Sequence, residues 1–468
     1  MDAVSQHCRP CYRGGWHGMN PIRYQEDVKE FLKQVCSHIR AKEVHHEVQM
    51  ELEGHLQDII EEKLDRGIAL NTAIKEAITQ MGAPELIGAQ FHKVHRPRTD
   101  WKLLGLLSFF ILFGLVAVFT AQASLVQRLG FSSIGLKQVI YVCVGGLLML
   151  GIRLFNYQKL ASYSWALYIG TLILLVYSIT TGYRLNGMDG YLQLGRFVVN
   201  VVSISPYLFL LSLAGIWTDK PTNQLTESWI KSIARSLWLN FGILLIPCVI
   251  FLKAHSLTDF ILFFLGSASM LLTLKKSRSI LITHVTLIFG SAFFFLLTSH
   301  HRSNSFDRWM AFLKPKEDTQ GFNYVLTQSK EAITSASWWG HGYGTPLPTL
   351  PELHSNMMFA YLIYCFGWVA GILIFLMVIL FIFHSLQISG KIRDTYGKAL
   401  LSGILTLFVI QFIWPMLMSF GWAPLGAFSL PFISYNGTLV IFQFAAIGLI
   451  LSVYRRKDLL GIQTKRQN

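Results

Sequence analysis

The sequence predicts an all-α polytopic membrane protein, with about ten transmembrane helices and a small N-terminal cytosolic helical domain. The chain has 468 residues, of which 52% are hydrophobic and 14% are charged. Soluble globular proteins carry about a quarter charged residues. Apolar runs of about 18 residues or more, long enough to cross a bilayer as a helix, recur along the chain. Both observations indicate that most of the chain lies in a membrane.

The beginning of the chain differs from the rest in composition. Residues 1–23 predict a disordered leader, and its Cys8 and Cys11 lack the four-ligand frame of a zinc site, so we predict no metal centre there. Residues 24–100 predict the cytosolic helical domain, because their apolar residues recur at helical spacing. This part of the chain contains no apolar core of a cleavable signal peptide, so we expect the N-terminus to stay in the cytoplasm.

Hydrophobic spans after Trp101 predict a membrane domain over residues 101–457. We place the spans near 103–123, 137–154, 163–181, 196–217, 236–252, 257–274, 279–298, 356–385, 398–420 and 431–454. With the N-terminus inside, every inner loop carries Lys or Arg and the short outer loops are poorer in charge, as the positive-inside rule requires. We therefore expect the tail 458–468 to be cytosolic and residues 299–354 to form one large outer loop.

The formal net charge of +14 does not indicate a nucleic-acid partner. Residues 1–100 hold 13 Lys/Arg against 15 Asp/Glu, and the remainder holds 27 against 11. The positive excess therefore lies in the loops of the membrane domain, where it sets the topology. We expect contact with the lipid bilayer and none with nucleic acid.

Polar chemistry concentrates at the predicted outer surface. Ionisable residues inside a membrane often mark ion pathways, but no predicted span centre holds a clear acid, which argues against ion-coupled transport. The large outer loop contains the glycine cluster GHGYG at 340–344, which predicts a tight turn because no Lys-Ser/Thr follows it. The loop ends in LPELHSNMMFA at 350–360, where a hydrophobic helix begins. With LPFISYNGT at 430–438, this segment is the predicted reactive zone.

Four segments resemble the SEDS family of bacterial membrane proteins, the FtsW/RodA/SpoVE group. LPFISYNGT is similar to the family motif LPFISYGGS at seven of nine positions. LPELHSNMMFA resembles the family's loop-to-helix motif LPE-x-H-T-D-F-x-F-A. The run RWMAFLKPKEDTQGFNYVLTQSKEAI at 308–333, with GHGYG, resembles the large outer loop, and NGMDGYLQLG at 186–195 resembles the second outer loop. The resemblance covers about residues 101–457.

This resemblance implies a role in peptidoglycan synthesis at the bacterial cell membrane. Family members polymerise the lipid-linked precursor lipid II at the outer face, commonly with a transpeptidase penicillin-binding protein, in cell shape, division or sporulation. The carboxylate at the motif's Asp position is proposed to deprotonate the acceptor hydroxyl, as a general base does. Here that position is Asn356, whose amide has no useful basicity. Glu352 is the Glu of LPE and a candidate replacement, and the candidate substrate-binding residues are His354, Ser434 and Tyr435.

Three functions are consistent with these motifs. Asn356 and other lost charges, such as Gly190–Tyr191 in place of the family's Arg–Trp pair, favour a non-catalytic scaffold or regulator that keeps the fold. An active glycosyltransferase needs a relocated base, for which Glu352 is one helical turn away if the segment is helical, and an active enzyme is expected to use a divalent cation. A flippase for lipid-linked precursors is the third function. The N-terminal domain resembles cytosolic prefix domains and is expected to be regulatory or adaptor-like.

Overall fold

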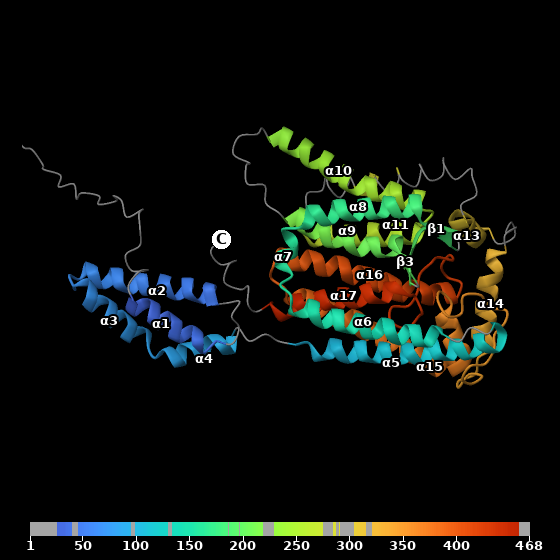
Figure 1. The fold of residues 1–468 in the computed structure, drawn as a ribbon, viewed down its shortest axis with the longest axis horizontal. Helices are drawn as coiled ribbons and strands as arrows, with labels where there is room; N and C mark the ends of the chain where they lie inside the picture. Colours follow the sequence, from blue (N-terminus) through green and yellow to red (C-terminus); the bar gives the residue numbers. More distant parts are fainter. Residues whose placement is uncertain are drawn as a thin grey trace, which may run out of the picture. The chain divides into compact units, whose positions relative to one another are not determined.

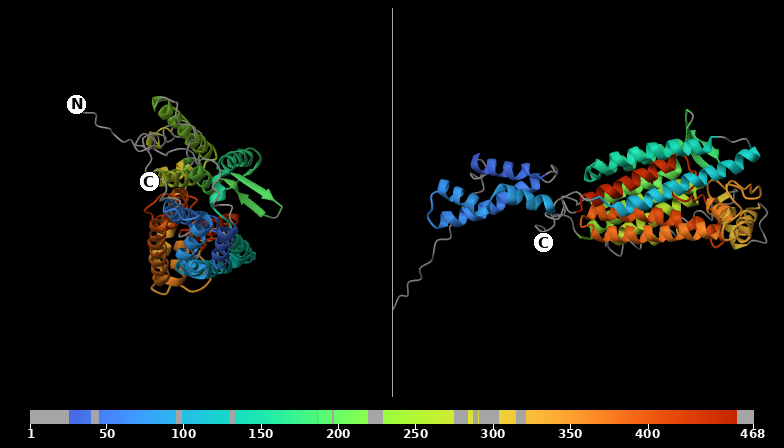
Figure 2. Two further views of the ribbon diagram at one scale, coloured as in Figure 1. Left: turned by 90° about the vertical axis from the view of Figure 1, so that its left-hand side faces the viewer. Right: turned by 90° about the horizontal axis from the view of Figure 1, so that it is seen from below.

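The computed structural model describes most of the chain, in residues 26–39, 45–94, 99–129, 133–185, 187–195, 197–218, 229–274, 284–286, 290, 304–314 and 321–457. These residues divide into two compact units, one before residue 99 and one over residues 99–457 (Figure 1 and Figure 2). The predicted leader 1–23 and the predicted tail 458–468 lie outside the described residues.

The first unit is a group of helices packed around one core, formed by α1 (Glu26–Ser37), α2 (His45–Asp65), α3 (Leu70–Met81) and α4 (Pro84–Val94). Apolar residues three or four positions apart lie on one side of a helix and can be buried together. Val35, Leu56 and Ala77 are fully buried in this way. Gly82 separates α3 from α4 with a φ of 98°, a conformation that glycine adopts without steric cost.

The second unit is a bundle of long apolar helices that run side by side (Figure 1). Those long and apolar enough to cross a membrane are α5 (Trp101–Leu129), α6 (Ile134–Leu154), α8 (Ser164–Thr181), α9 (Val201–Thr218), α15 (Met358–Lys391), α16 (Thr395–Ser419) and α17 (Thr438–Arg455). Shorter apolar stretches lie in α10 (Trp229–Lys253) and α11 (Leu257–Thr273). The predicted polytopic helical class is confirmed. The span 279–298 lies mostly outside the described residues, so the count of ten stays a prediction.

A small antiparallel sheet lies at one end of the bundle. It is formed, in the order β1-β2-β3, by β1 (Tyr183–Leu185), β2 (Met188–Leu194) and β3 (Phe197–Asn200). The helices α13 (Asn304–Leu313) and α14 (Phe322–Ser335) lie at the same end, and α7 (Gln158–Ala161) lies at the opposite end (Figure 1). The sequence did not predict this sheet, and the expected span 196–217 begins as β3 instead. Glycine turns explain the difference, because Gly187 and Gly195 have φ values of 82° and 64°.

The long helix α15 is broken at Gly367, where φ is 77°. The GHGYG segment packs into this break, with its backbone N–H groups at His341 and Gly342 donating to the carbonyls of Tyr364 and Cys365 at 3.0 and 2.9 Å. Glycine is required on both sides of the contact. A Cβ on Gly367 would lie 2.1 Å from the Trp338 carbonyl oxygen. The predicted tight turn is confirmed, and its hydrogen bonds hold the predicted outer loop against α15.

Candidate functional site

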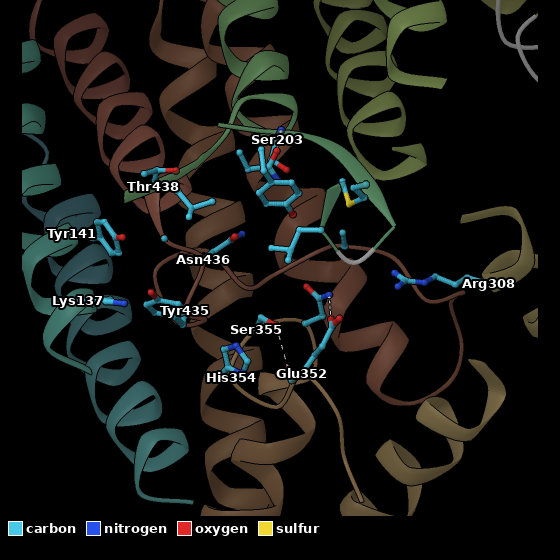
Figure 3. A pocket seen from close by; sticks show the side chains of 18 residues that line it. Lys137, Tyr141, Ser203, Arg308, Glu352, His354, Ser355, Tyr435, Asn436 and Thr438 are labelled. Atoms are coloured by element: carbon cyan, nitrogen blue, oxygen red, sulfur yellow. Dashed lines mark hydrogen bonds between the residues drawn. The ribbon is translucent and has the colours of Figure 1, made fainter. Parts of the chain in front are cut away.

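A cavity of about 280 Å³ lies at the end of the bundle that carries the sheet (Figure 3). Its walls come from the N-terminal ends of α6 and α17, from α13, from two loops and from the hairpin formed by the antiparallel strands β1, β2 and β3. Its lining residues are Lys137, Tyr141, Leu185, Met188, Tyr191, Val198, Asn200, Ser203, Arg308, Glu352, His354, Ser355, Asn356, Ala427, Tyr435, Asn436, Gly437 and Thr438. The two motifs that the sequence singled out are thus brought together in one concave site.

Glu352 and Asn356 face each other across a tight turn that precedes α15. The turn is closed by the backbone N–H groups of Ser355 and Met357, which donate to the Glu352 carbonyl at 3.0 and 3.2 Å. Glu352 has a φ of 52°, a strained conformation for a residue with a side chain. The Asn356 Nδ2 donates to the Glu352 carboxylate. The condition for helical spacing of these two residues is not met, because α15 begins only at Met358.

His354 and Tyr435 join the two motifs on another side of the cavity. The Tyr435 backbone N–H donates to the His354 carbonyl at 2.9 Å, and the two ring centroids lie 6.1 Å apart. Burial lowers the pKa of His354, against the opposing effect of the Glu352 carboxylate, so the imidazole is neutral near pH 7. Burial, followed by the Tyr141 phenol, raises the pKa of Tyr435 to about 12. Both side chains therefore offer uncharged hydrogen-bonding groups.

Ser434 does not line the cavity, although it lies beside Tyr435 in the sequence. Its side chain is buried, its Oγ accepts from the Leu430 N–H at 3.2 Å, and its own N–H donates to the Leu430 carbonyl at 3.0 Å. These bonds close the turn that presents Tyr435. Among the predicted residues, the structure therefore brings Glu352, His354, Asn356 and Tyr435 together and gives Ser434 a structural position.

Charge is distributed unevenly around the cavity. Glu352 is the single carboxylate among the lining residues, whereas Lys137 and Arg308 are cations that lie on opposite sides of it (Figure 3). The described residues contain no group of three or more His, Cys, Asp or Glu side chains that could hold a metal ion.

Sequence reasoning missed the hairpin wall of the cavity. Tyr191, Asn200 and Ser203 line it, and the buried Asp259 lies behind Ser203, whose Oγ donates to the Asp259 carboxylate at 3.3 Å. The resemblance at 186–195 marked Tyr191 as a changed position, but not as part of a cavity wall, and it did not reach Asn200 or Ser203. Only the antiparallel register, with Tyr191 opposite Asn200, brings them to one place.

Comparison with known proteins identifies the chain's relatives. The sequence model of the FtsW/RodA/SpoVE group, described as cell cycle protein, matches residues 100–459. The chain belongs to this family. The predicted SEDS membership is therefore confirmed, and the chain is a membrane-spanning bacterial protein of that group. The match covers the second unit and leaves out the helices α1 to α4.

Individual SEDS relatives have low sequence identity to this chain, but two of them align with more than two thirds of it. Peptidoglycan glycosyltransferase RodA of Treponema pallidum is 22% identical over 390 residues, which cover 69% of this chain and 90% of the relative. A probable peptidoglycan glycosyltransferase FtsW of Trichlorobacter lovleyi is 25% identical over 359 residues, with coverage of 73% and 89%. Peptidoglycan glycosyltransferase MrdB of Escherichia coli is 32% identical over 173 residues, with coverage of 36% and 45%.

Solved structures share the fold of the second unit. A chain from a peptidoglycan synthase complex that coordinates polymerization and crosslinking has a TM-score of 0.61 at 18% identity, covering 77% of this chain and 98% of its own length. RodA of Thermus thermophilus has a TM-score of 0.55 at 17% identity, with coverage of 77% and 97%. At these identities the likeness concerns the fold alone.

Proposed function

We propose that this SEDS protein takes part in peptidoglycan synthesis as a non-catalytic scaffold or regulator, whose cavity binds lipid II or a related lipid-linked precursor at the outer face of the membrane. Family membership and a polar cavity lined by both motifs support the pathway and the binding. A transpeptidase penicillin-binding protein is the proposed partner, because a peptidoglycan synthase complex supplies one of the similar folds.

The amide of Asn356 is the observation that supports the absence of polymerase chemistry. An amide cannot accept a proton near neutral pH, so this residue can orient an acceptor hydroxyl but cannot deprotonate it. The same amide donates to the Glu352 carboxylate. The replacement at the motif position thus removes the base that the family motif supplies there.

A polymerisation assay tests this proposal. The purified full chain in lipid nanodiscs is given lipid II and a divalent cation, and glycan strands are separated on a gel beside those of an active SEDS relative. We expect saturable binding of lipid II and no strands from the native protein. Asn356→Asp tests the motif position. If the native role needs no glycan product, cells that carry this variant should behave like cells that carry the native protein. Strand formation by the native protein contradicts the proposal.

A second candidate function is an active glycosyltransferase that uses Glu352 as its base. The single carboxylate among the lining residues, held at a strained φ of 52°, favours this alternative. In the same assay, strands made by the native protein and lost in Glu352→Gln identify this enzyme. The conservative Glu352→Asp variant keeps a carboxylate one methylene shorter and serves as the matched control, since partial activity there separates loss of basicity from loss of shape.

A further inference from the structure

The hairpin wall of the cavity offers uncharged hydrogen-bonding groups whose direction is fixed from behind. Tyr191 lies on β2, Asn200 ends β3, and Ser203 lies in the first turn of α9. All three line the cavity, and Figure 3 shows Ser203 across it from Glu352 and His354. Such groups suit a neutral, hydroxyl-rich ligand, whereas charged groups suit an ionic one.

Asp259 determines which way the Ser203 hydroxyl points. The Asp259 side chain is only 2% exposed, and its Oδ2 accepts from Ser203 Oγ at 3.3 Å and from Ser256 Oγ at 2.6 Å. A serine hydroxyl has one proton and two acceptor lone pairs. Because the Ser203 proton is directed to Asp259, the oxygen that faces the cavity can only accept a hydrogen bond. The Ser256 contact caps the start of α11, but the Ser203 contact is not needed for that cap.

Tyr191 offers the opposite group, a hydrogen-bond donor, beside Asn200. The Asn200 Oδ1 accepts from the Ser203 backbone N–H at 3.1 Å, which caps α9 and leaves the Asn200 amide group to act as a donor. Burial, then the Asp259 and Glu352 carboxylates, raises the pKa of Tyr191 to about 12, so the phenol keeps its proton at pH 7. The phenol O–H of Tyr191 lines the cavity and can therefore donate to a ligand.

We propose that Tyr191 and Ser203 form a saccharide subsite in which Tyr191 donates to the ligand and Ser203 accepts from it. The subsite rests on the proposed function, because it assigns the sugar part of the lipid-linked precursor to the hairpin wall. The ligand must present an acceptor and a donor close together, as neighbouring hydroxyl or acetamido groups of a neutral sugar do. Asp259 is a positioning residue that sets the direction of the Ser203 bond without touching the ligand.

Binding measurements with two lipids test the subsite. The full chain in nanodiscs is titrated with a lipid-linked N-acetylated disaccharide and with the same lipid diphosphate lacking sugar. Tyr191→Phe and Ser203→Ala should each lower the affinity for the sugar-bearing lipid by about threefold to tenfold, which is the usual contribution of one hydrogen bond. The affinity for the sugar-free lipid should stay unchanged. Ser203→Thr keeps the hydroxyl and should restore affinity.

A matched control lies on the neighbouring strand. Tyr183 pairs with Tyr191 in the sheet, is 38% exposed and is not among the lining residues, so Tyr183→Phe should bind both lipids normally. If Tyr191→Phe and Ser203→Ala lower the affinity for both lipids equally, the proposed subsite is overturned, because a distorted cavity gives that result. Unchanged sugar binding in both variants also overturns it. If the native protein binds neither lipid, the proposed function itself fails.

Discussion

Replacing Gly367 by alanine should uncouple the predicted outer loop, which contains the GHGYG segment, from α15. Gly367 has a φ of 77°, and a Cβ there would lie 2.1 Å from the Trp338 carbonyl oxygen and 2.6 Å from the Gly340 nitrogen. Both neighbours are backbone atoms, so no side chain can rotate to make room. The loop must move away, and the hydrogen bonds that join it to the broken part of α15 must lengthen or be lost.

The magnitude follows from the strain and from these bonds. A side chain in the left-handed region costs about 1–3 kcal/mol. Four backbone hydrogen bonds join the segments, between Trp368 and Ser337, Val369 and Trp338, His341 and Tyr364, and Gly342 and Cys365. Loss of two or more of them, at about 1 kcal/mol each, adds about 2–4 kcal/mol. Gly367→Ala should therefore lower the free energy of unfolding of the second unit by about 3–7 kcal/mol.

Thermal unfolding in detergent, followed by tryptophan fluorescence, measures this effect, and limited proteolysis of the outer loop localises it. Gly390→Ala is the matched control on the same helix, because a Cβ there meets nothing within 4 Å. Alanine at an unstrained helical position is neutral or stabilises by up to about 1 kcal/mol. Equal unfolding temperatures and equal proteolysis of the two variants refute the reasoning.

Three further predictions concern the cavity and the bundle core. Asn356→Asp places a second carboxylate against Glu352, and the repulsion should raise the pKa of the pair. The melting temperature should therefore show this variant to be less stable than the native protein at pH 8, by about 1–2 kcal/mol. Its stability should recover towards pH 5, where one carboxylate is protonated. His354 has a lowered pKa, so the native state favours neutral imidazole; stability should fall as pH drops below about 6.5, and His354→Gln should reduce this fall. Tyr207→Phe removes the 2.7 Å bond to the Gln411 Oε1 and should destabilise the bundle by about 1–3 kcal/mol in the same melt.

Each of these has a result that contradicts it. An Asn356→Asp variant with the stability-pH profile of the native protein means that the two side chains do not face each other. A His354→Gln variant with an unchanged acid branch means that another group causes the loss. A Tyr207→Phe variant as stable as the native protein means that the buried polar contact between α9 and α16 contributes no net stability.

Much of the fold followed from the sequence because its signal is local. A helix that crosses lipid must satisfy its own backbone hydrogen bonds and present apolar side chains along its length. The apolar runs near α5, α6, α16 and α17 therefore stand out without any knowledge of their neighbours. The sheet at 183–200 gave no such signal, because its strands are short and its turns depend on glycines whose positive φ values are set by chain reversal.

The site was only partly predictable for the same reason. Motif resemblance singled out His354, Asn356 and Tyr435, which do line one cavity. It could not distinguish Tyr435 from Ser434, because which of two adjacent side chains enters a cavity depends on the turn that carries them. It also could not predict Ser203 as a lining residue, because the hydroxyl of Ser203 is directed by the buried Asp259, more than 50 residues away in the chain.

The sequence by itself determined the family, the helical membrane fold and the chemical gap at Asn356, since residue identity and apolar run length are local properties. The tertiary structure decided that the Asn356 amide donates to Glu352, that α15 breaks at Gly367 around the outer loop, and that the hairpin completes the cavity. Those features depend on segments remote in sequence meeting at one end of a bundle. Their geometry is set by the packing of whole helices.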